Sequence, residues 1–265
     1  MLNSNSSSWL LTGNSGVVNT SNFIGTLDNV PFNIRVHNQQ AGKIDKNMLN
    51  TFWGYHAGYV DTGLYLNPIA NSNTGIGAYA FSSNIYGMNN TAVGVYALQN
   101  SIAGGSNTAL GYGAMANLTG GDENTAVGYQ ALGVGNGSFN TATGNNALYN
   151  NISGNYNTAN GDFSLYENST GLQNSAFGYN ALVHNFNGNF NTAMGGNALA
   201  GSDSGSANTG LGFGADVSAI DLTNATSIGY NTIVNASNKV RLGNNSVTVI
   251  EGMVPFSNVS DERFK

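Results

Sequence analysis

Carboxylate side chains that could catalyse a reaction are few and scattered in this 265-residue chain. Cleavage of a glycosidic bond needs two carboxyl groups flanking the bond. The candidate pairs in the middle of the chain are Asp122 with Glu123 and Asp162 with Glu167. Adjacent acids on a strand or turn usually diverge, so we expect these four residues to be solubilising surface groups rather than a polysaccharide-degrading site.

Other reactive constellations are also missing from the sequence. His37, His56 and His184 are far apart, and the chain has no Ser-His-acid arrangement, phosphate-binding loop or HExxH motif. There is no Cys, so a thiolate metal site is excluded, and the oxygen-rich segments 121–123 and 203–205 are too sparse for a calcium loop. We therefore expect a protein that is not an enzyme and that has no cofactor and no metal.

The charge distribution limits the partners of the chain. The net charge is -6, and no Lys or Arg occurs between Lys46 and Lys239. A surface without cations cannot bind phosphates by releasing counterions, so we expect neither a nucleic-acid partner nor binding to an anionic membrane. No apolar stretch is long enough to span a bilayer, so membrane insertion is not expected either.

A 17-residue repeat must position whatever residues the chain uses. Its unit reads N-T-A-x-G-x-x-A-L followed by about eight variable residues, and ten copies begin between Asn73 and Ala225. A divergent eleventh copy begins at Asn50. The fifth position is glycine in all ten regular copies, namely Gly77, Gly94, Gly111, Gly128, Gly144, Gly161, Gly178, Gly195, Gly212 and Gly229.

This repeat predicts an all-β fold, a β-solenoid or β-roll. The period is too short for a pair of helices, and T-A-V-G-Y alternates as a strand does. We expect each coil to contain a short strand, a bend, a second short strand and a Gly-rich turn, with each strand pairing with its equivalent about 4.8 Å away. The expected segments are an N-terminal attachment or lead-in region at 1–49, with a strand near 32–36; eleven coils and a short closing coil at 50–241; and a C-terminal strand and connector at 242–259, with the strand at 247–250.

Small residues at positions three and five of the unit predict either a narrow coil interior or close approach of another backbone. Three chains packing these faces together would bury more apolar area, so we expect a homotrimer in which the repeated glycines serve solenoid and trimer packing. The Asn at position one either forms amide ladders between coils or reflects simple turn propensity.

The variable turns are the candidate receptor-facing surface. Insertions in repeat proteins map to the binding face, and aromatic residues occur in these turns at Tyr86, Phe139, Tyr156, Phe186 and Phe190. They could stack on sugar rings or pack turn upon turn. The single Thr at position two is a weaker pattern than the paired Thr array expected of an ice-binding solenoid.

The repeat resembles the β-roll heads of trimeric autotransporter adhesins. The whole layout is similar to trimeric tail fibres that end in an endosialidase-type intramolecular chaperone, with residues 22–38 like the lead-in, 50–241 like the shaft and 260–265 like the opening of the chaperone domain. The resemblance implies chaperone-templated trimerisation and self-cleavage between Val259 and Ser260. The rest of such a chaperone domain is absent from this sequence.

Together these features predict an extracellular structural fibre that mediates attachment to a host cell surface. In this interpretation the chain is the shaft or receptor-binding part of a virion tail fibre, and residues 1–49 join it to the particle or to the fibre base. Its expected partners are two further copies of itself and a cell-surface glycan or protein receptor. The alternatives are a bacterial surface filament or adhesin without a virus and, third, a polysaccharide-degrading tailspike.

Overall fold

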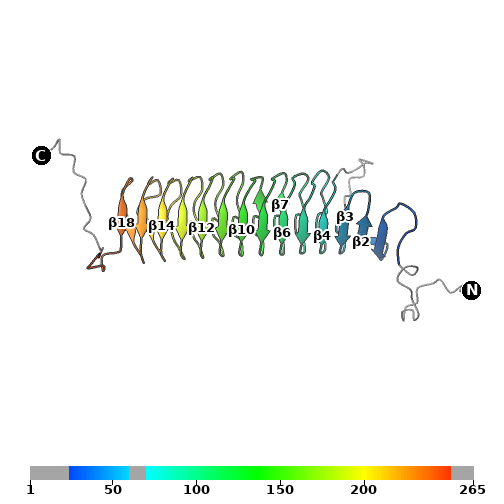
Figure 1. Cartoon of the computed structure of the whole chain (residues 1–265), viewed down its shortest axis with the longest axis horizontal. Helices are drawn as coiled ribbons and strands as arrows, with labels where there is room; N and C mark the ends of the chain where they lie inside the picture. Colours follow the sequence, from blue (N-terminus) through cyan, green and yellow to red (C-terminus); the bar gives the residue numbers. More distant parts are fainter. Residues whose placement is uncertain (1–23, 60–69, 252–265) are drawn as a thin grey trace, which may run out of the picture.

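The computed structural model describes residues 24–59 and 70–251, which form an elongated β-solenoid (Figure 1). It has about ten turns, spaced about 17 residues apart, and no helix in the described residues. The predicted all-β solenoid is therefore confirmed. The strands are β1 (Phe32–Val36), β2 (Gln39–Asp45), β3 (Asn50–Trp53), β4 (Thr74–Ile76), β5 (Thr91–Val93), β6 (Thr108–Leu110), β7 (Asn117–Leu118), β8 (Thr125–Val127), β9 (Val134–Gly135), β10 (Thr141–Thr143), β11 (Thr158–Asn160), β12 (Ser175–Phe177), β13 (Thr192–Met194), β14 (Thr209–Leu211), β15 (Asp216–Val217), β16 (Thr226–Ile228), β17 (Ile233–Val234) and β18 (Val240–Leu242).

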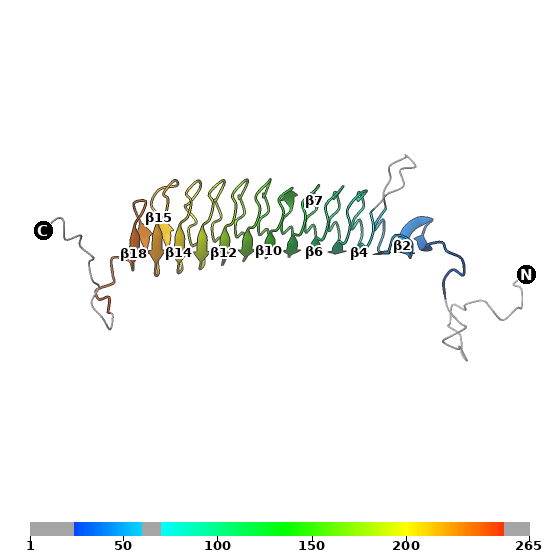
Figure 2. The ribbon, with the colours of Figure 1, turned by 45° about the horizontal axis from the view of Figure 1, so that its top comes forward.

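One long sheet runs along the whole solenoid. It has 14 strands in the order β1-β2-β3-β4-β5-β6-β8-β10-β11-β12-β13-β14-β16-β18, and from β3 onward neighbouring strands are parallel. The register pairs each residue with the same repeat position one coil later, as in Thr141 with Thr158 and Ala142 with Ala159. In Figure 2 these strands form one row along one side of the narrow coils. The predicted pairing between equivalent strands is confirmed.

The interior of each coil is narrow because it is lined by alanine and one larger apolar side chain. The alanines at positions three and eight, such as Ala126 and Ala131, are fully buried, and so is the position-nine residue of the first eight regular coils, such as Leu148. These residues form one continuous core cluster along the described chain. The predicted narrow coil interior is therefore confirmed for the position-three residues, and the expected packing of these residues between chains is wrong, because their own coil already buries them.

The glycine at position five is required by the close approach of the next coil. In Gly111 the backbone has φ of 136°, and a Cβ there would overlap the carbonyl oxygen of Gly128. The other nine repeat glycines also have positive φ, and eight of them face the neighbouring glycine in the same way, Gly229 being the exception. The structure thus places them between coils of a single chain.

The second strand expected in every coil forms in only two places. The pairs β7 with β9 and β15 with β17 are the only such strands in the described residues. Positions seven and nine in most coils take a left-handed backbone, as in Asn146 (φ 54°) and Leu148 (φ 52°), which turns the chain instead of extending it. The strands β15 and β17 begin at position nine, in two coils where that residue is not left-handed, whereas β7 and β9 begin two residues after it.

Asparagine at position one forms a buried ladder. Of the two alternatives for this residue, amide ladders between coils and simple turn propensity, the ladder is confirmed. The backbone N–H of Asn140 donates to Oδ1 of Asn124 over 2.9 Å, and Nδ2 of Asn140 donates to the carbonyl of Gly154 over 2.9 Å. The same pattern recurs at 17-residue intervals, for example from Asn157 to Asn140. Each amide therefore satisfies backbone groups of two other segments inside the wall of the solenoid.

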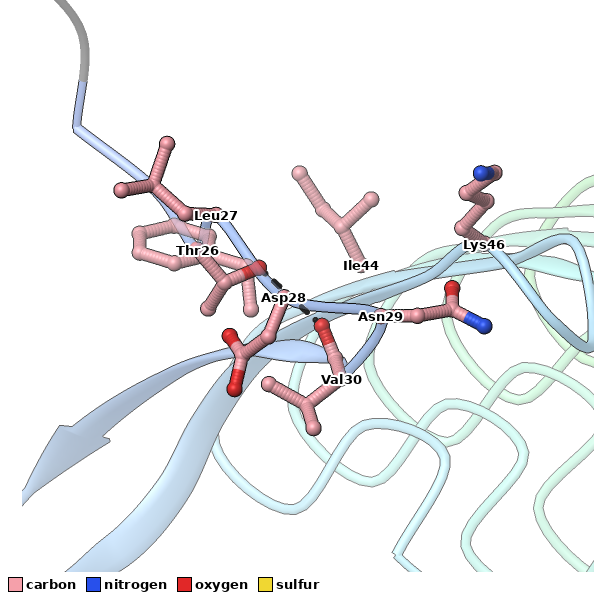
Figure 3. Close-up of a pocket in the computed structure, with 8 residues that line it drawn as sticks. Thr26, Leu27, Asp28, Asn29, Val30, Ile44 and Lys46 are labelled. Atoms are coloured by element: carbon pink, nitrogen blue, oxygen red, sulfur yellow. Dashed lines mark hydrogen bonds between the residues drawn. The ribbon is translucent and has the colours of Figure 1, made fainter.

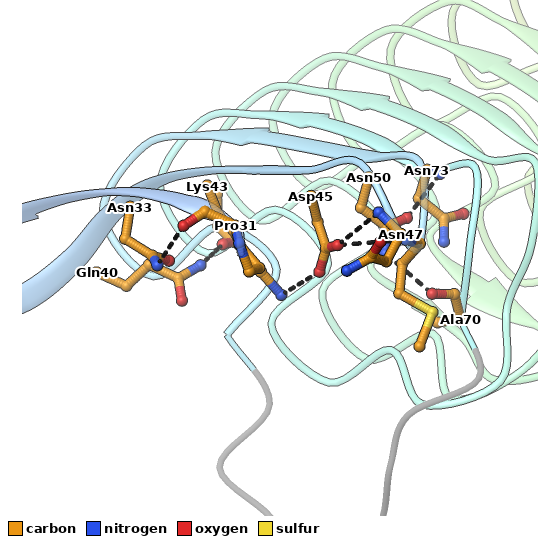
Figure 4. Close-up of polar contacts among 11 residues, drawn as sticks. Pro31, Asn33, Gln40, Lys43, Asp45, Asn47, Asn50, Ala70 and Asn73 are labelled. Carbon is orange, nitrogen blue, oxygen red and sulfur yellow. Dashed lines mark hydrogen bonds and ion pairs between the residues drawn. The ribbon is translucent and has the colours of Figure 1, made fainter. Parts of the chain in front are cut away.

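The N-terminal end of the sheet is covered by the antiparallel hairpin of β1 and β2. The predicted strand near 32–36 is β1, and β2 pairs antiparallel with β3. Buried Asp45 ends β2: its carboxylate accepts hydrogen bonds from the N–H groups of Asn47 and Met48 and contacts Lys43 Nζ at 2.9 Å (Figure 4). The row of parallel strands therefore ends in an antiparallel hairpin, with β1 as the outermost strand of the sheet.

The C-terminal end differs from the expectation. The predicted short closing coil is present as β18, which pairs with β16. The strand predicted at 247–250 is wrong: these residues form no strand, and Val249 is 64% exposed. Val247 folds back against Gly243, so the chain leaves the sheet before it can add another strand. The predicted self-cleavage junction at Val259 and Ser260 and the segment 260–265 lie outside the described residues.

Candidate functional site

The outer face of the long sheet carries two rows of side chains that run along the shaft. Position two supplies the threonine row, and position four supplies a row that we call the outer apolar row. Register pairing aligns both rows, as in Thr108 with Thr125 and Leu110 with Val127. The outer apolar row consists of Trp53, Ile76, Val93, Leu110, Val127, Phe177, Met194, Leu211, Ile228 and Leu242.

Large hydrophobic side chains in this row are open to solvent in the single chain. Trp53 is 57% exposed, and Leu110 and Met194 are each 47% exposed. The hairpin extends the apolar face. Phe32 pairs with Ile44, and Ile44 pairs with Thr51 of the threonine row, whose side chains point outward. Soluble single chains rarely leave so long a contiguous apolar surface uncovered, and such surfaces mark interaction sites.

A second apolar strip lies just beyond the edge of the sheet. The strand ends at position four, the glycine at position five begins the bend, and position six carries Tyr55, Tyr112, Tyr129, Tyr179, Phe213 and Tyr230. Several rings contact one another along the shaft, including Tyr112 and Tyr129, whose ring centroids are 5.4 Å apart. We call this set the aromatic strip; all six residues are exposed by more than a third.

The aromatic residues predicted to face a receptor are exposed but do not form one site. Phe139 and Tyr156 stack in parallel with ring centroids 4.8 Å apart, and they remain 42% and 57% exposed. Phe190 occupies the same repeat position but has no ring partner among the described residues, whereas Tyr86 and Phe186 lie at other turn positions. Turn-upon-turn packing therefore holds for one pair, and all five rings keep accessible surface.

The acidic residues act mainly on the solenoid itself. Asp122 Oδ1 accepts the N–H of Gly105 over 2.7 Å, and Asp162 Oδ1 accepts the N–H of Asn145 over 2.9 Å. Glu167 pairs with His184 over 2.8 Å on the exposed surface. The remaining acid considered for catalysis, Glu123, is exposed in a left-handed turn. None of these four acids lines the hollow at the N-terminal hairpin or the smaller one between Lys43 and Asn84.

The other two histidines are also engaged locally. His56 Nε2 lies 3.0 Å from Gln39 Oε1, and its ring stacks on Tyr55 with centroids 4.1 Å apart. His37 is exposed in the left-handed turn between β1 and β2. No group of three or more His, Asp or Glu residues that could hold a metal occurs in the described residues.

Two aspartates have shifted pKa values in opposite directions. Burial raises the pKa of Asp216, and hydrogen bonds from the N–H groups of Val217 and Gly201 only partly offset this. For Asp45, burial also acts to raise the pKa, but hydrogen bonds from Lys43, Met48 and Asn47 outweigh it and lower the pKa. Asp216 stands at position nine, where the eight preceding regular coils carry a buried apolar residue.

A hollow lies at the N-terminal hairpin. It has a volume of about 320 Å³ and is lined by Leu27, Val30, Phe32, Ile44 and Lys46, with Thr26, Asp28 and Asn29 (Figure 3). The hollow falls within the region 1–49 that the sequence predicts to join the shaft to a particle. Its mixed lining gives it no recognisable chemistry beyond an apolar contact.

Comparisons with protein-family models, with curated proteins and with solved structures gave no match. No helix among residues 24–59 and 70–251 is long and apolar enough to cross a membrane.

The sequence pattern does not determine that the outer apolar row points toward solvent. Alternation groups position four with positions two and six on one face of the strand but does not say which face points to solvent. The small residue at position three, which is Ala in seven of the ten regular copies and Gly or Ser in the others, is the signal that the opposite face lines a narrow core.

Proposed function

We propose that this chain is the shaft of a homotrimeric attachment fibre, of the kind found in virion tail fibres or comparable cell-surface appendages. In this proposal the outer apolar row and the aromatic strip pack between chains, and the variable turns face outward toward a cell-surface receptor. The observation that carries it is the exposed apolar face that runs along the solenoid on both sides of two polar coils.

The period of this face favours a second copy of the chain as its partner. The row repeats about every 4.8 Å, so only a partner with the same period can contact every coil equally well. A second copy has that period. Asp162, at position six, is the one charged side chain at positions four and six of the coils. Electrostatic attraction to a charged partner is therefore not part of the recognition.

Two adjacent strips favour three chains over two. A twofold dimer uses the same patch on both chains, whereas a cyclic trimer needs two different patches on each chain. A dimer joined through the sheet face would leave the aromatic strip beyond the bend uncovered. A trimer in which the sheet face of one chain meets the aromatic strip of the next would cover both.

The proposed receptor is a surface glycan, because exposed aromatic rings can stack on sugars without needing cations. Phe139, Tyr156 and Phe190 are exposed and share the repeat position that directly precedes the next ladder asparagine. Three chains in one fibre would present each such site three times, and multivalency would raise the avidity of weak individual contacts.

An array of bacterial surface polysaccharides probed with the labelled chain tests attachment. We expect binding to at least one polysaccharide, no release of reducing sugars, and a loss of binding of about tenfold or more in Phe139→Ala/Tyr156→Ala, since each lost stacking contact removes part of a multivalent interaction. The matched control is Ile152→Ala, another exposed turn residue, which should bind normally. Binding unchanged in the double variant would contradict the assignment of these turns, and sugar release would favour the tailspike.

A further inference from the structure

The outer apolar row and the position-six strip both carry polar residues in the same two coils. In the outer apolar row, the register Val127, Thr143, Asn160 and Phe177 places two polar residues between apolar neighbours. At position six of the same two coils the residues are Asn145 and Asp162 instead of aromatic or aliphatic side chains. No other pair of consecutive coils is polar in both strips.

The fold of one chain does not require these polar residues. Thr143 and Asn160 belong to regular strands, their neighbours Ala142 and Ala159 are fully buried, and Gly144 and Gly161 have the usual positive φ. The side chains of Thr143 and Asn160 make no hydrogen bond within the described residues, and Asn160 is exposed. Their polarity therefore needs an explanation outside the single coil.

A periodic interface has a register problem. If one chain slides by one coil, about 4.8 Å, every T-A-x-G segment again faces a T-A-x-G segment. An apolar row alone would lose contact at only one coil at each end of the shaft. Such rows specify their axial alignment weakly, because the hydrophobic effect is not directional.

We propose that Thr143 and Asn160 fix the axial register of the chains in the fibre. This inference rests on the proposed homotrimer. When the chains are aligned, the polar residues of all three lie at the same level and can hydrogen-bond to one another. When a chain slips by one coil, either Asn160 or Thr143, depending on the direction, faces an apolar level and is buried without a partner, which is costly.

The same principle operates in coiled coils, where one buried Asn in an apolar seam selects the register at some expense in stability. Here the polar level also includes Asn145 and Asp162. Asp162 Oδ1 already accepts the N–H of Asn145, so the second strip keeps its polar groups partly satisfied within one chain. Thr143 and Asn160 are therefore the residues whose partners depend on alignment.

Methyl NMR of methionine tests the register directly. Met194 lies in the outer apolar row and is 47% exposed, whereas Met115 is fully buried in its own coil. In an aligned trimer the three Met194 methyl groups are equivalent and give one signal. In Thr143→Val/Asn160→Val we expect at least two Met194 signals, because slipped chains place Met194 against different neighbours, while Met115 keeps one signal.

The controls separate the possible failures. Asn187→Val, at an exposed turn position, should keep the single Met194 signal, and Asn160→Val alone serves if the double variant does not fold. A trimeric variant that keeps one Met194 signal would overturn the register role and leave the trimer intact. A wild-type chain that is monomeric by light scattering would overturn the proposed function itself.

Discussion

At the scale of single residues, the position-one asparagines are the polar support of the solenoid. Asn124 Oδ1 accepts the N–H of Asn140, and Asn124 Nδ2 donates to the carbonyl of Gly137 over 2.9 Å, all within the buried wall. Removing this amide leaves both backbone groups without partners. Each buried unsatisfied group costs about 1–3 kcal/mol.

We therefore expect Asn124→Ala to lower the unfolding free energy by at least that amount, measured by denaturant titration followed by circular dichroism. The exposed Asn187→Ala, whose side chain makes no hydrogen bond in the described residues, is the matched control and should change stability little. Equal effects of the two substitutions would mean that the ladder contributes nothing beyond turn propensity.

The repeat glycines give a second residue-scale prediction. In Gly111→Ala the new Cβ would overlap the carbonyl of Gly128, and the φ of 136° is accessible almost only to glycine. Backbone strain of this kind costs about 1–3 kcal/mol before the overlap is counted. Gly120→Ala is the control, because a methyl group added at Gly120 would have no neighbouring atom within 4 Å and the backbone there has no positive φ.

Thermal unfolding of the two variants gives the comparison. A clearly lower midpoint for Gly111→Ala, with Gly120→Ala close to wild type, is the expected result. If Gly111→Ala were as stable as wild type, the close approach of consecutive coils at position five would be refuted.

At the scale of elements, the two ends of the solenoid contain acids that respond to pH in opposite senses. The pKa of Asp216 in β15 is raised, so its contribution to stability is complete below the unfolded value of 3.8 and is lost as pH rises through the folded pKa. The pKa of Asp45, at the end of β2, is lowered, so its contribution is present above 3.8 and is lost as pH falls through the folded pKa.

Unfolding midpoints measured between pH 7 and pH 3 should separate these contributions. Relative to wild type, Asp216→Asn should be more stable at neutral pH and lose this advantage on acidification, since Asn can keep accepting the N–H groups without carrying a charge. Asp45→Asn should be less stable at neutral pH, with the deficit shrinking in acid. Parallel pH curves for all three proteins would contradict both assignments.

The elements also define how far the sequence could predict the fold. The repeat of N-T-A-x-G predicted the pairing of equivalent strands and the closing coil β18, because spacing and alternation are visible in the residues. The strand β1 was predicted from its own residues near 32–36, but its hairpin with β2 was not. The missing second strands could not be predicted, since a left-handed Leu148 looks in sequence like a strand residue. Val247 to Ile250 reads as a strand for its β-branched residues, yet Val247 folds back against Gly243 and the segment does not pair with β18, the last strand of the sheet.

At the scale of the whole molecule, the small residues of the repeat do not form the contact between chains that was predicted for them. Alanine and glycine at positions three and five suggested contact between chains, but burial in a narrow coil and stacking on the next coil explain them within one chain. Which face of an alternating strand points inward depends on how the coil closes, and the left-handed turns that close it were not evident from the sequence. The proposed trimer contact therefore lies at the outer apolar row, at Trp53, Leu110, Met194 and their equivalents.

The native mass of the purified chain in light scattering tests the central claim most directly. One chain has a mass of 27.4 kDa, and the proposed trimer predicts about 82 kDa, three times that value. Leu110→Lys/Met194→Lys should reduce the mass to that of one folded chain, because charges in the outer apolar row repel across the interface, whereas Tyr86→Lys on an exposed turn should remain trimeric. A wild-type chain that is folded and monomeric at 27.4 kDa would contradict the account and favour a single-chain solenoid, including an ice-binding one.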